Sequence, residues 1–321
     1  MKNINNKSIA LFITFFISAI AFNYCLNANA QNTSSTAKTP TYKRLQDAKN
    51  FQIKGKGKAF LPKNLQQTNK PEQADDSEFR RRGVIGWDDR IPMLSRKYPW
   101  SAIGRVQGFN NDGGSYHCTG TLISDDVVLT NAHCVIDPDT RKFSQKIQFI
   151  PNVINGKAGD NSDIAEVENV VYGTDFTGTK LDNQVNDWAV LKLNKPIGLK
   201  YGYIGWKSLP SSALIANSNK YIFVGYSGDF PDNNNQKYQF FTAGKGWTAG
   251  VEKGCSIVNE DSNILFHDCD TAGGSSGGAI IGVVGNQPYI LALNNAEYKR
   301  NGEAIINLAV KIDFLDRLVG N

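Results

Sequence analysis

From Val84 onward the chain alternates short apolar runs with clusters of Gly, Asn, Asp and Pro. Runs of this kind, bounded by turn-forming residues, are typical of β-strands. A dozen of them predict an all-β fold built as a sandwich or a pair of barrels. The predicted strands are Trp100–Val106, Thr119–Ile123, Val127–Thr130, Lys146–Phe149, Ile164–Val171, Trp188–Leu193, Tyr221–Val224, Gln239–Trp247, Ile264–Phe266, Ala279–Val284, Tyr289–Leu293 and Ala304–Ala309.

A connector and one helix complete the predicted architecture. The connector, Asn194–Ser211, contains two prolines and divides the strands into two sets of small-domain size. We therefore expect two β-barrels, over about 84–197 and 198–321. A short C-terminal helix is predicted over Val310–Val319, because its apolar residues share one helical face.

The first thirty residues have the pattern of a secretory signal peptide. Lys2 and Lys7 precede the apolar run Ile9–Phe22, and the small-residue site Ala28-Asn29-Ala30 follows. A membrane anchor is the alternative, but the run is short for a bilayer span. We expect residues 1–30 to be removed on export and the mature protein to be extracellular or periplasmic, away from the membrane.

Residues 31–83 are expected to form a propeptide. They are rich in Lys, Gln, Asn, Thr and Ser, a composition that predicts a mobile or weakly folded segment. The basic run Arg80-Arg81-Arg82 near its end suits a trypsin-like processing enzyme. A linker that stays attached is the alternative. The protease domain proper would then be residues 84–321.

Net charge divides at the same place. Residues 1–82 hold 14 Lys and Arg against 5 Asp and Glu, whereas the remainder holds 21 against 25. The basic character therefore belongs to the part expected to be removed, and no nucleic-acid partner is inferred from it.

Four cysteines remain after export, namely Cys118, Cys134, Cys255 and Cys269. An even number in an exported protein favours disulfides over metal ligation. Of the three possible connectivities, the local pairs Cys118–Cys134 and Cys255–Cys269 are the simplest. No CxxC pair or histidine cluster indicates zinc, and no metal or other cofactor is expected.

Candidate chemistry centres on Gly274-Ser275-Ser276-Gly277-Gly278, followed by the apolar run from Ala279. Glycines around a serine allow a tight turn that exposes the hydroxyl and aims backbone N–H groups at one point. Such turns are common in β proteins, so the motif is weak alone and needs a histidine and a carboxylate upstream.

The chain supplies both partners at the ends of predicted strands. His133 follows Val127–Thr130, and Asp187 opens the strand that begins at Trp188. A satisfied core histidine and a strand-end turn aspartate are the alternatives for each residue alone. The order His133, Asp187, Ser276 is one of the three known orders of a Ser-His-Asp triad.

These residues lie in blocks that resemble the chymotrypsin-like (trypsin-like) serine proteases. The resemblance rests on Thr119-Gly120-Thr121-Leu122-Ile123-Ser124, on the block Leu129–Cys134, and on the spacing between Cys118 and Cys134. Val84-Ile85-Gly86-Trp87-Asp88-Asp89-Arg90 and Gly225-Tyr226-Ser227-Gly228-Asp229 are similar to the bacterial glutamyl-endopeptidase branch. The resemblance covers most of 84–310 and implies two six-stranded antiparallel β-barrels.

The resemblance also implies roles for individual residues. Ser276 would be the nucleophile, His133 the general base and acid, and Asp187 the group that orients the histidine. The backbone N–H groups of Gly274 and Ser276 would form the oxyanion hole. His117 and His267 have no catalytic context, although His117 adjoins Cys118.

The specificity pocket is where this chain departs from its relatives. Asn294 aligns with the histidine on which glutamate preference depends, and Thr271 matches a pocket threonine. Asp270 lies six residues before the serine, where trypsin keeps the aspartate that binds basic side chains. Both basic and glutamate preferences stay open. Ser275 replaces the aspartate that pairs with the new N-terminus in trypsin-type activation, so that ion pair cannot form.

The function predicted from the sequence is therefore a secreted serine endopeptidase made as a preproenzyme, acting on protein or peptide substrates as a monomer. The alternative from another class is an exported binding protein with the protease fold and no turnover.

Overall fold

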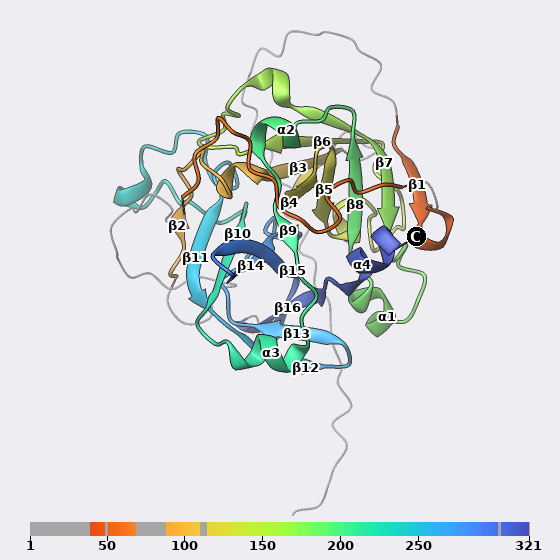
Figure 1. Cartoon of the computed structure of the whole chain (residues 1–321). Coiled ribbons are helices and arrows are strands. Elements are labelled where there is room, and N and C mark those ends of the chain that lie inside the picture. The colour runs from red at the N-terminus through yellow and green to blue at the C-terminus, as the bar shows by residue number, and fades with distance from the viewer. Residues whose placement is uncertain (1–38, 49–50, 69–87, 110–113, 301–302, 321) are drawn as a thin grey trace, which may run out of the picture. The chain divides into compact units, whose positions relative to one another are not determined.

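The computed structural model describes residues 39–48, 51–68, 88–109, 114–300 and 303–320 (Figure 1). The expected signal peptide and the basic run Arg80–Arg82 lie outside these ranges, as do residues 84–87. Strands dominate the described chain, as the sequence predicts, and the fold class is confirmed.

The first barrel is a closed ring of six antiparallel strands. Each strand pairs with the next in the order β3-β4-β5-β8-β7-β6, and β6 pairs again with β3. All four side chains of β5 are buried, which explains its unbroken apolar sequence. The bounds are β3 Ile103–Phe109, β4 Ser115–Ser124, β5 Val127–Thr130, β6 Lys146–Pro151, β7 Ala165–Tyr172 and β8 Ala189–Leu193.

The second barrel is formed by a sheet in the order β12-β13-β16-β15-β14-β10-β11-β2, with β9 beside β15. Only Ser256 separates β11 from β12, so these two strands are halves of one segment that pairs with β10 at one end and β13 at the other. This continuity closes the second ring. The bounds are β2 Ile91–Pro92, β9 Gly205–Trp206, β10 Tyr221–Gly225, β11 Gly250–Cys255, β12 Ile257–Asp261, β13 Ile264–His267, β14 Ala279–Val284, β15 Gln287–Arg300 and β16 Glu303–Lys311.

Helices are short and lie at the margins of the barrels. They are α1 Lys180–Val185, α2 Gly198–Tyr201, α3 Ser211–Ala216 and α4 Asp313–Gly320, with 3₁₀ turns at Leu45–Asp47, Trp100–Ala102, Ala132–Cys134, Asn161–Asp163 and Gln236–Tyr238. The predicted C-terminal helix is present but begins at Asp313, because β16 continues through Lys311. Phe314 of α4 stacks on Trp188 of the first barrel with ring centroids 4.1 Å apart.

One predicted strand is wrong. Gln239–Trp247 forms turns, and Gly244 and Gly246 adopt positive φ angles that a strand cannot contain. Its aromatic residues serve other contacts, as the indole of Trp247 lies 3.9 Å from the guanidinium carbon of Arg105. The strands that follow, β11 and β12, were not among the predicted ones.

The N-terminal segment, defined as residues 39–48 and 51–68, is folded. This corrects the expectation of a mobile or weakly folded region. Its strand β1, Thr41–Arg44, pairs in parallel with Asn169–Tyr172 of β7. Ile53 is only 3% exposed. A few apolar side chains and backbone pairing order the segment although its composition is polar.

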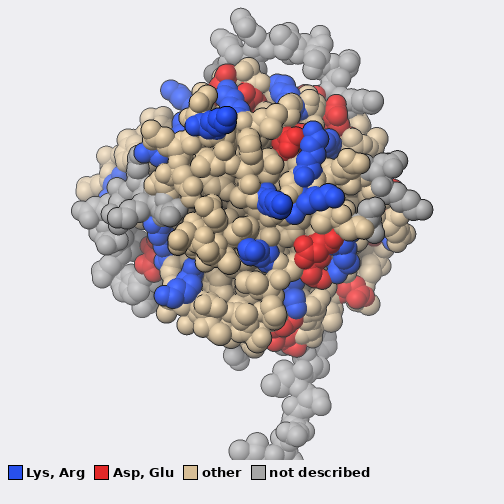
Figure 2. Space-filling model, in the orientation of Figure 1, with Lys and Arg blue, Asp and Glu red and all other residues tan. Residues whose placement is uncertain are grey.

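The charged surface shows no single sign on the face drawn in Figure 2. Blue and red side chains are interspersed there, in keeping with the nearly balanced charge of the chain after residue 82. Among the residues described, no helix is long and apolar enough to cross a membrane.

Candidate active site

His133 and Asp187 are brought together by the first barrel. Thr130 ends β5 and pairs with Ala189 of β8, so the residues just beyond these two strand ends are neighbours. One Asp187 oxygen lies 2.6 Å from His133 Nδ1, and the other accepts the His133 backbone N–H at 2.9 Å. The Asn131 side chain donates to the Asp187 carbonyl at 2.6 Å. The carboxylate thus fixes both the histidine ring and its backbone.

The pKa of His133 follows from this pairing. Burial alone would lower the pKa, but the charge of Asp187 and its hydrogen bond outweigh burial, so the pKa is raised above 6.5. Because a carboxylate accepts at Nδ1, the neutral ring carries its proton there. Nε2 is then left as the basic nitrogen, as a general base requires.

Ser276 lies on a turn of the second barrel that is docked on the first. Thr119 of β4 donates its backbone N–H to the Ser276 carbonyl at 2.8 Å, and its hydroxyl to the Gly274 carbonyl at 3.0 Å. The Thr119 hydroxyl also accepts the Tyr226 N–H at 2.8 Å. Thr119 therefore joins the two barrels at the residue expected to carry the nucleophile.

The backbone N–H groups of Gly274 and Ser276 are the candidates for an oxyanion hole. Within the described residues, neither the Gly274 N–H nor the Ser276 N–H donates a hydrogen bond, while the intervening Ser275 N–H is used by Ala272. Gly274 has a φ of +96°, and an added Cβ would lie 2.3 Å from His117 Nε2. The turn therefore requires glycine at this position, and it leaves two N–H groups available to a developing negative charge.

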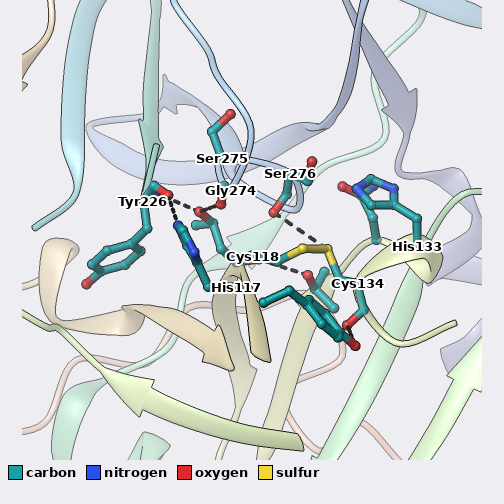
Figure 3. The surroundings of a disulfide bond; sticks show 12 residues. His117, Cys118, His133, Cys134, Tyr226, Gly274, Ser275 and Ser276 are labelled. Carbon is teal, nitrogen blue, oxygen red and sulfur yellow. Dashed lines mark hydrogen bonds between the residues drawn. A yellow bond between two sulfur atoms is a disulfide. The ribbon is translucent and has the colours of Figure 1, made fainter. Parts of the chain in front are cut away.

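Figure 3 draws Ser276 and His133 on the same side of the Cys118–Cys134 bridge. The Ser276 carbonyl lies 3.9 Å from Sγ of Cys134, the residue after His133. Ser276 Oγ is 3.4 Å from the Asn295 carbonyl, and no hydrogen bond to His133 is formed among the described contacts. In substrate-free enzymes the hydrogen bonds between catalytic groups are often long and tighten only with substrate.

Both disulfides have the local pairing that the sequence favours. Cys118–Cys134 ties β4 to the 3₁₀ turn carrying His133, with Cα atoms 5.9 Å apart. Cys255–Cys269 ties β11 to the segment that leads to Ser276. The described groupings of potential metal ligands both include these bridged cysteines, whose thiols are not available as ligands.

His117 lies beside Gly274 of the candidate oxyanion-hole turn (Figure 3). Its Nε2 is 2.8 Å from the Tyr226 carbonyl and must donate, because that oxygen only accepts. Burial and the nearby Arg105 lower the pKa of His117 to about 3, so the ring is neutral at any working pH. His117 and Thr119 of β4 thus both contact this turn.

Asp270 is buried, with 1% of its surface exposed, and its carboxylate accepts the Asp89 N–H at 3.0 Å. Its own backbone N–H donates to the Glu252 carboxylate. Burial and the negative charge of Asp270 raise the pKa of Glu252. Two acidic groups thus share a buried site near the start of the segment that carries Ser276.

The neighbouring Asp88 and Asp229 form ion pairs with the buried side chain of Arg90. Both carboxylates contact the guanidinium of Arg90, at 2.8 Å and 2.9 Å, and the Arg90 side chain is 1% exposed. Arg90 also lies over the Phe230 ring. These pairings anchor the chain before β2 to the second barrel.

Asn294 faces the turn that carries Ser276. Its side-chain amide donates to the Ser275 carbonyl at 3.1 Å, its carbonyl accepts the Gly277 N–H at 3.0 Å, and its N–H donates to Gly278 at 2.9 Å. Thr271 is 1% exposed, and its hydroxyl has no hydrogen-bond partner within the described chain. Among the predicted pocket residues, the Thr271 hydroxyl thus makes no hydrogen bond within the described chain, whereas the Asn294 side chain is hydrogen-bonded to the turn.

Sequence reasoning missed the positioning residues Thr119 and Tyr226. Both lie inside blocks that carried the resemblance, but their roles depend on how one barrel docks on the other. No periodicity or spacing in the sequence signals that contact.

Comparisons with known proteins place the chain among proteases. A family model described as Trypsin matches residues 94–317. Serine protease 23 from Rattus norvegicus is 29% identical over 233 residues, which cover 66% of this chain and 54% of that protein. The chain thus spans about half the length of that relative. Glutamyl endopeptidase from Bacillus licheniformis is 27% identical over 227 residues, covering 70% and 62%.

Solved structures give the same picture. A structure described as Glu endopeptidase in complex with MPD is 26% identical, covers 74% of this chain and all of its own, and has a TM-score of 0.57. The protease Anisep from Arthrobacter nicotinovorans has a TM-score of 0.53 at 18% identity, which supports the fold alone.

Proposed function

Since the chain belongs to the trypsin family, we propose that it is a serine endopeptidase that uses Ser276, His133 and Asp187. The observation that supports this most is the double contact of Asp187 with His133, at 2.6 Å and 2.9 Å, beside the clamped turn of Ser276. The similarity to glutamyl endopeptidase, expected from the sequence, is confirmed. Membership of this family implies polypeptide substrates.

The proposed reaction proceeds through an acyl-enzyme. Ser276 Oγ attacks the carbonyl carbon of the scissile bond while His133 Nε2 takes the hydroxyl proton. The resulting oxyanion accepts hydrogen bonds from the N–H groups of Gly274 and Ser276. His133 then gives its proton to the leaving amine, and water, deprotonated by the same nitrogen, hydrolyses the ester. Asp187 stabilises the imidazolium throughout.

We extend the proposal to the side chain recognised before the cleaved bond. Burial and the negative charge of Asp270 raise the pKa of Glu252 to about 9, so at neutral pH this buried pair carries the single negative charge of Asp270. Such a site disfavours a second carboxylate and favours charge-assisted bonding to Lys or Arg. The unpaired Thr271 hydroxyl provides a further polar partner. Cleavage after basic residues is therefore preferred over cleavage after glutamate.

Export and processing belong to the same proposal. The lysines, apolar run and small-residue site of residues 1–30 support secretion, and the basic run Arg80–Arg82 supports a later cut that gives the mature enzyme.

The test is labelling with a fluorophosphonate probe, which reacts only with an activated serine. Purified protein should label, Ser276→Ala should not, and the matched variant Ser275→Ala should still label. Absent labelling of the correctly folded protein would instead support a protease-fold binding protein without turnover.

A further inference from the structure

The N-terminal segment makes an extended set of contacts with the first barrel. The red strand β1 lies beside β7 in Figure 1, and four residue pairs join the two strands, Thr41 to Asn169 through Arg44 to Tyr172. The Tyr42 hydroxyl donates to the Ser144 carbonyl at 2.7 Å, and its ring lies 4.5 Å from that of Phe143. Arg44 also pairs with Asp175.

A second set of contacts reaches the connector between the barrels. Phe60 and Tyr203 exchange two backbone hydrogen bonds, at 3.0 and 3.1 Å, and their rings stack at 5.2 Å. The Gly57 carbonyl accepts the Trp206 N–H at 3.1 Å. A Cβ on Gly205 would lie 2.3 Å from the Gly57 carbonyl oxygen, so the two backbones touch here. This close approach places the segment on β9 of the second barrel's sheet.

The end of the segment is held as well. Tyr98 donates its N–H to the Gln66 carbonyl and accepts the Thr68 N–H, both at 2.9 Å. Lys54 pairs with Asp125 at 3.0 Å. Ile53 joins the main apolar core with 3% of its surface exposed. The segment therefore contributes a strand pairing to the first barrel, backbone hydrogen bonds to the connector and β9, and buried side chains to the main core.

The contacts lead away from the candidate catalytic residues. The contacts given above for residues 41–66 are made with β7 and its surroundings, the connector and Tyr98, and none of those contacts is to His133, Asp187 or Ser276. An inhibitory propeptide has to occupy the substrate site or distort it. This segment instead covers β7 and the connector.

We propose that the N-terminal segment is a permanent, non-covalent part of the mature enzyme that bridges its two barrels. The proposal rests on the processing step given above. A cut anywhere between Thr68 and Asp88 adds one water across a peptide bond, leaving a carboxylate on one piece and an ammonium group on the other. None of the contacts described involves residues 69–87, so the cut removes none of them, and the mature protein consists of two chains.

The retained chain adds a second link between barrels that already contact each other at Thr119 and through the connector and α4. Buried apolar area and backbone ladders are what hold strands in a fold, and neither depends on an unbroken chain. Its loss would expose Tyr203 and Trp206 and leave the outer edge of β7 unpaired at Asn169–Tyr172.

The experiment replaces residues 72–77 with the recognition site of a site-specific protease in a Ser276→Ala background, so that the protein cannot cut itself. After cleavage, gel filtration in native buffer should return the fragment that ends in this site together with the protease domain. Guanidinium chloride should separate the two. A fragment that elutes alone in native buffer would overturn the proposal.

Matched variants identify the contacts responsible. Ile53→Asp combined with Phe60→Ala should release the fragment at least tenfold faster than the parent, whereas the exposed pair Gln52→Ala and Lys63→Ala should leave the release rate unchanged. Equal release from both would also contradict the proposal. Because co-elution does not depend on activity, this result is independent of fluorophosphonate labelling and separates the failure of one proposal from the failure of the other.

Discussion

Asn294 accepts a hydrogen bond from the buried ring of His267, with Oδ1 and Nε2 3.1 Å apart, while its amide group donates to Ser275. The amide nitrogen bonds a carbonyl, so its oxygen faces the histidine, whose Nε2 must be the donor. Burial lowers the pKa of His267 to about 4, which keeps the ring neutral. Asn294 thus links a core histidine to the residue before Ser276 and acts as a positioning residue.

Asn294→Asp should therefore lower kcat more than it raises KM. The new carboxylate would face the Ser275 carbonyl without a donor, and a lost buried hydrogen bond costs about 1–3 kcal/mol. We expect kcat to fall at least tenfold with KM within twofold, measured on a peptide ester. Asn259→Asp, on an exposed strand position, is the control. A large change in KM with constant kcat would indicate direct substrate contact instead.

The pH dependence of kcat/KM should report His133. The ring must be neutral to accept the Ser276 proton, and its pKa is raised, so the acid limb should have its midpoint above pH 6.5. The ion pair with Asp187 correspondingly stabilises the fold most fully below pH 6.5, and this contribution is lost as the pH rises through the raised pKa.

Asp187→Asn tests the cause of that shift. It removes the charge that raises the pKa and leaves the burial that lowers it, so the midpoint should move below its wild-type position. Turnover should fall by about 10⁴, the effect that this change has in the trypsin family. Near-normal turnover would exclude Asp187 from the proposed role.

His117 should matter through its shape and its hydrogen bond. His117→Phe fills the space beside Gly274 but cannot donate to the Tyr226 carbonyl, whereas His117→Gln can. We expect the Phe variant to lose kcat by a factor of about 10, less than the 10²–10³ lost with a whole oxyanion donor, and the Gln variant to recover most of it. The acid limb should not move, because His117 titrates near pH 3.

Asp270→Asn tests the preference for basic residues. The amide oxygen can still accept the Asp89 N–H, so the local fold is kept while the charge is removed. The ratio of kcat/KM for Arg-containing to Gln-containing peptides should fall at least tenfold. The exposed Asp261→Asn serves as control. An unchanged ratio, or faster cleavage after glutamate by the parent enzyme, would refute the basic preference.

The sequence predicted the candidate triad because each member lies beside a strand with recognisable flanks. The partners Thr119 and Tyr226 could not be predicted, since their hydrogen bonds cross from one barrel to the other. The strand predicted over Gln239–Trp247 was wrong because aromatic residues favour a strand only where a neighbouring strand is available for pairing.

The N-terminal segment shows the limit of composition. Its polar side chains indicated weak folding, but its order depends on backbone pairing and on a few apolar residues such as Tyr42, Ile53 and Phe60. Average composition cannot reveal a few buried apolar residues in a polar segment. It also cannot predict that a short strand will pair with the edge of an existing sheet.

The central claim is that Ser276 performs the hydrolysis with His133 as its base. The most direct measurement is the initial rate of peptide hydrolysis by the purified protein and by Ser276→Ala, His133→Ala and the double variant. The account predicts that all three lose activity to the same low level, because the two residues act as one unit. Full activity in Ser276→Ala, or losses that multiply in the double variant, would contradict it.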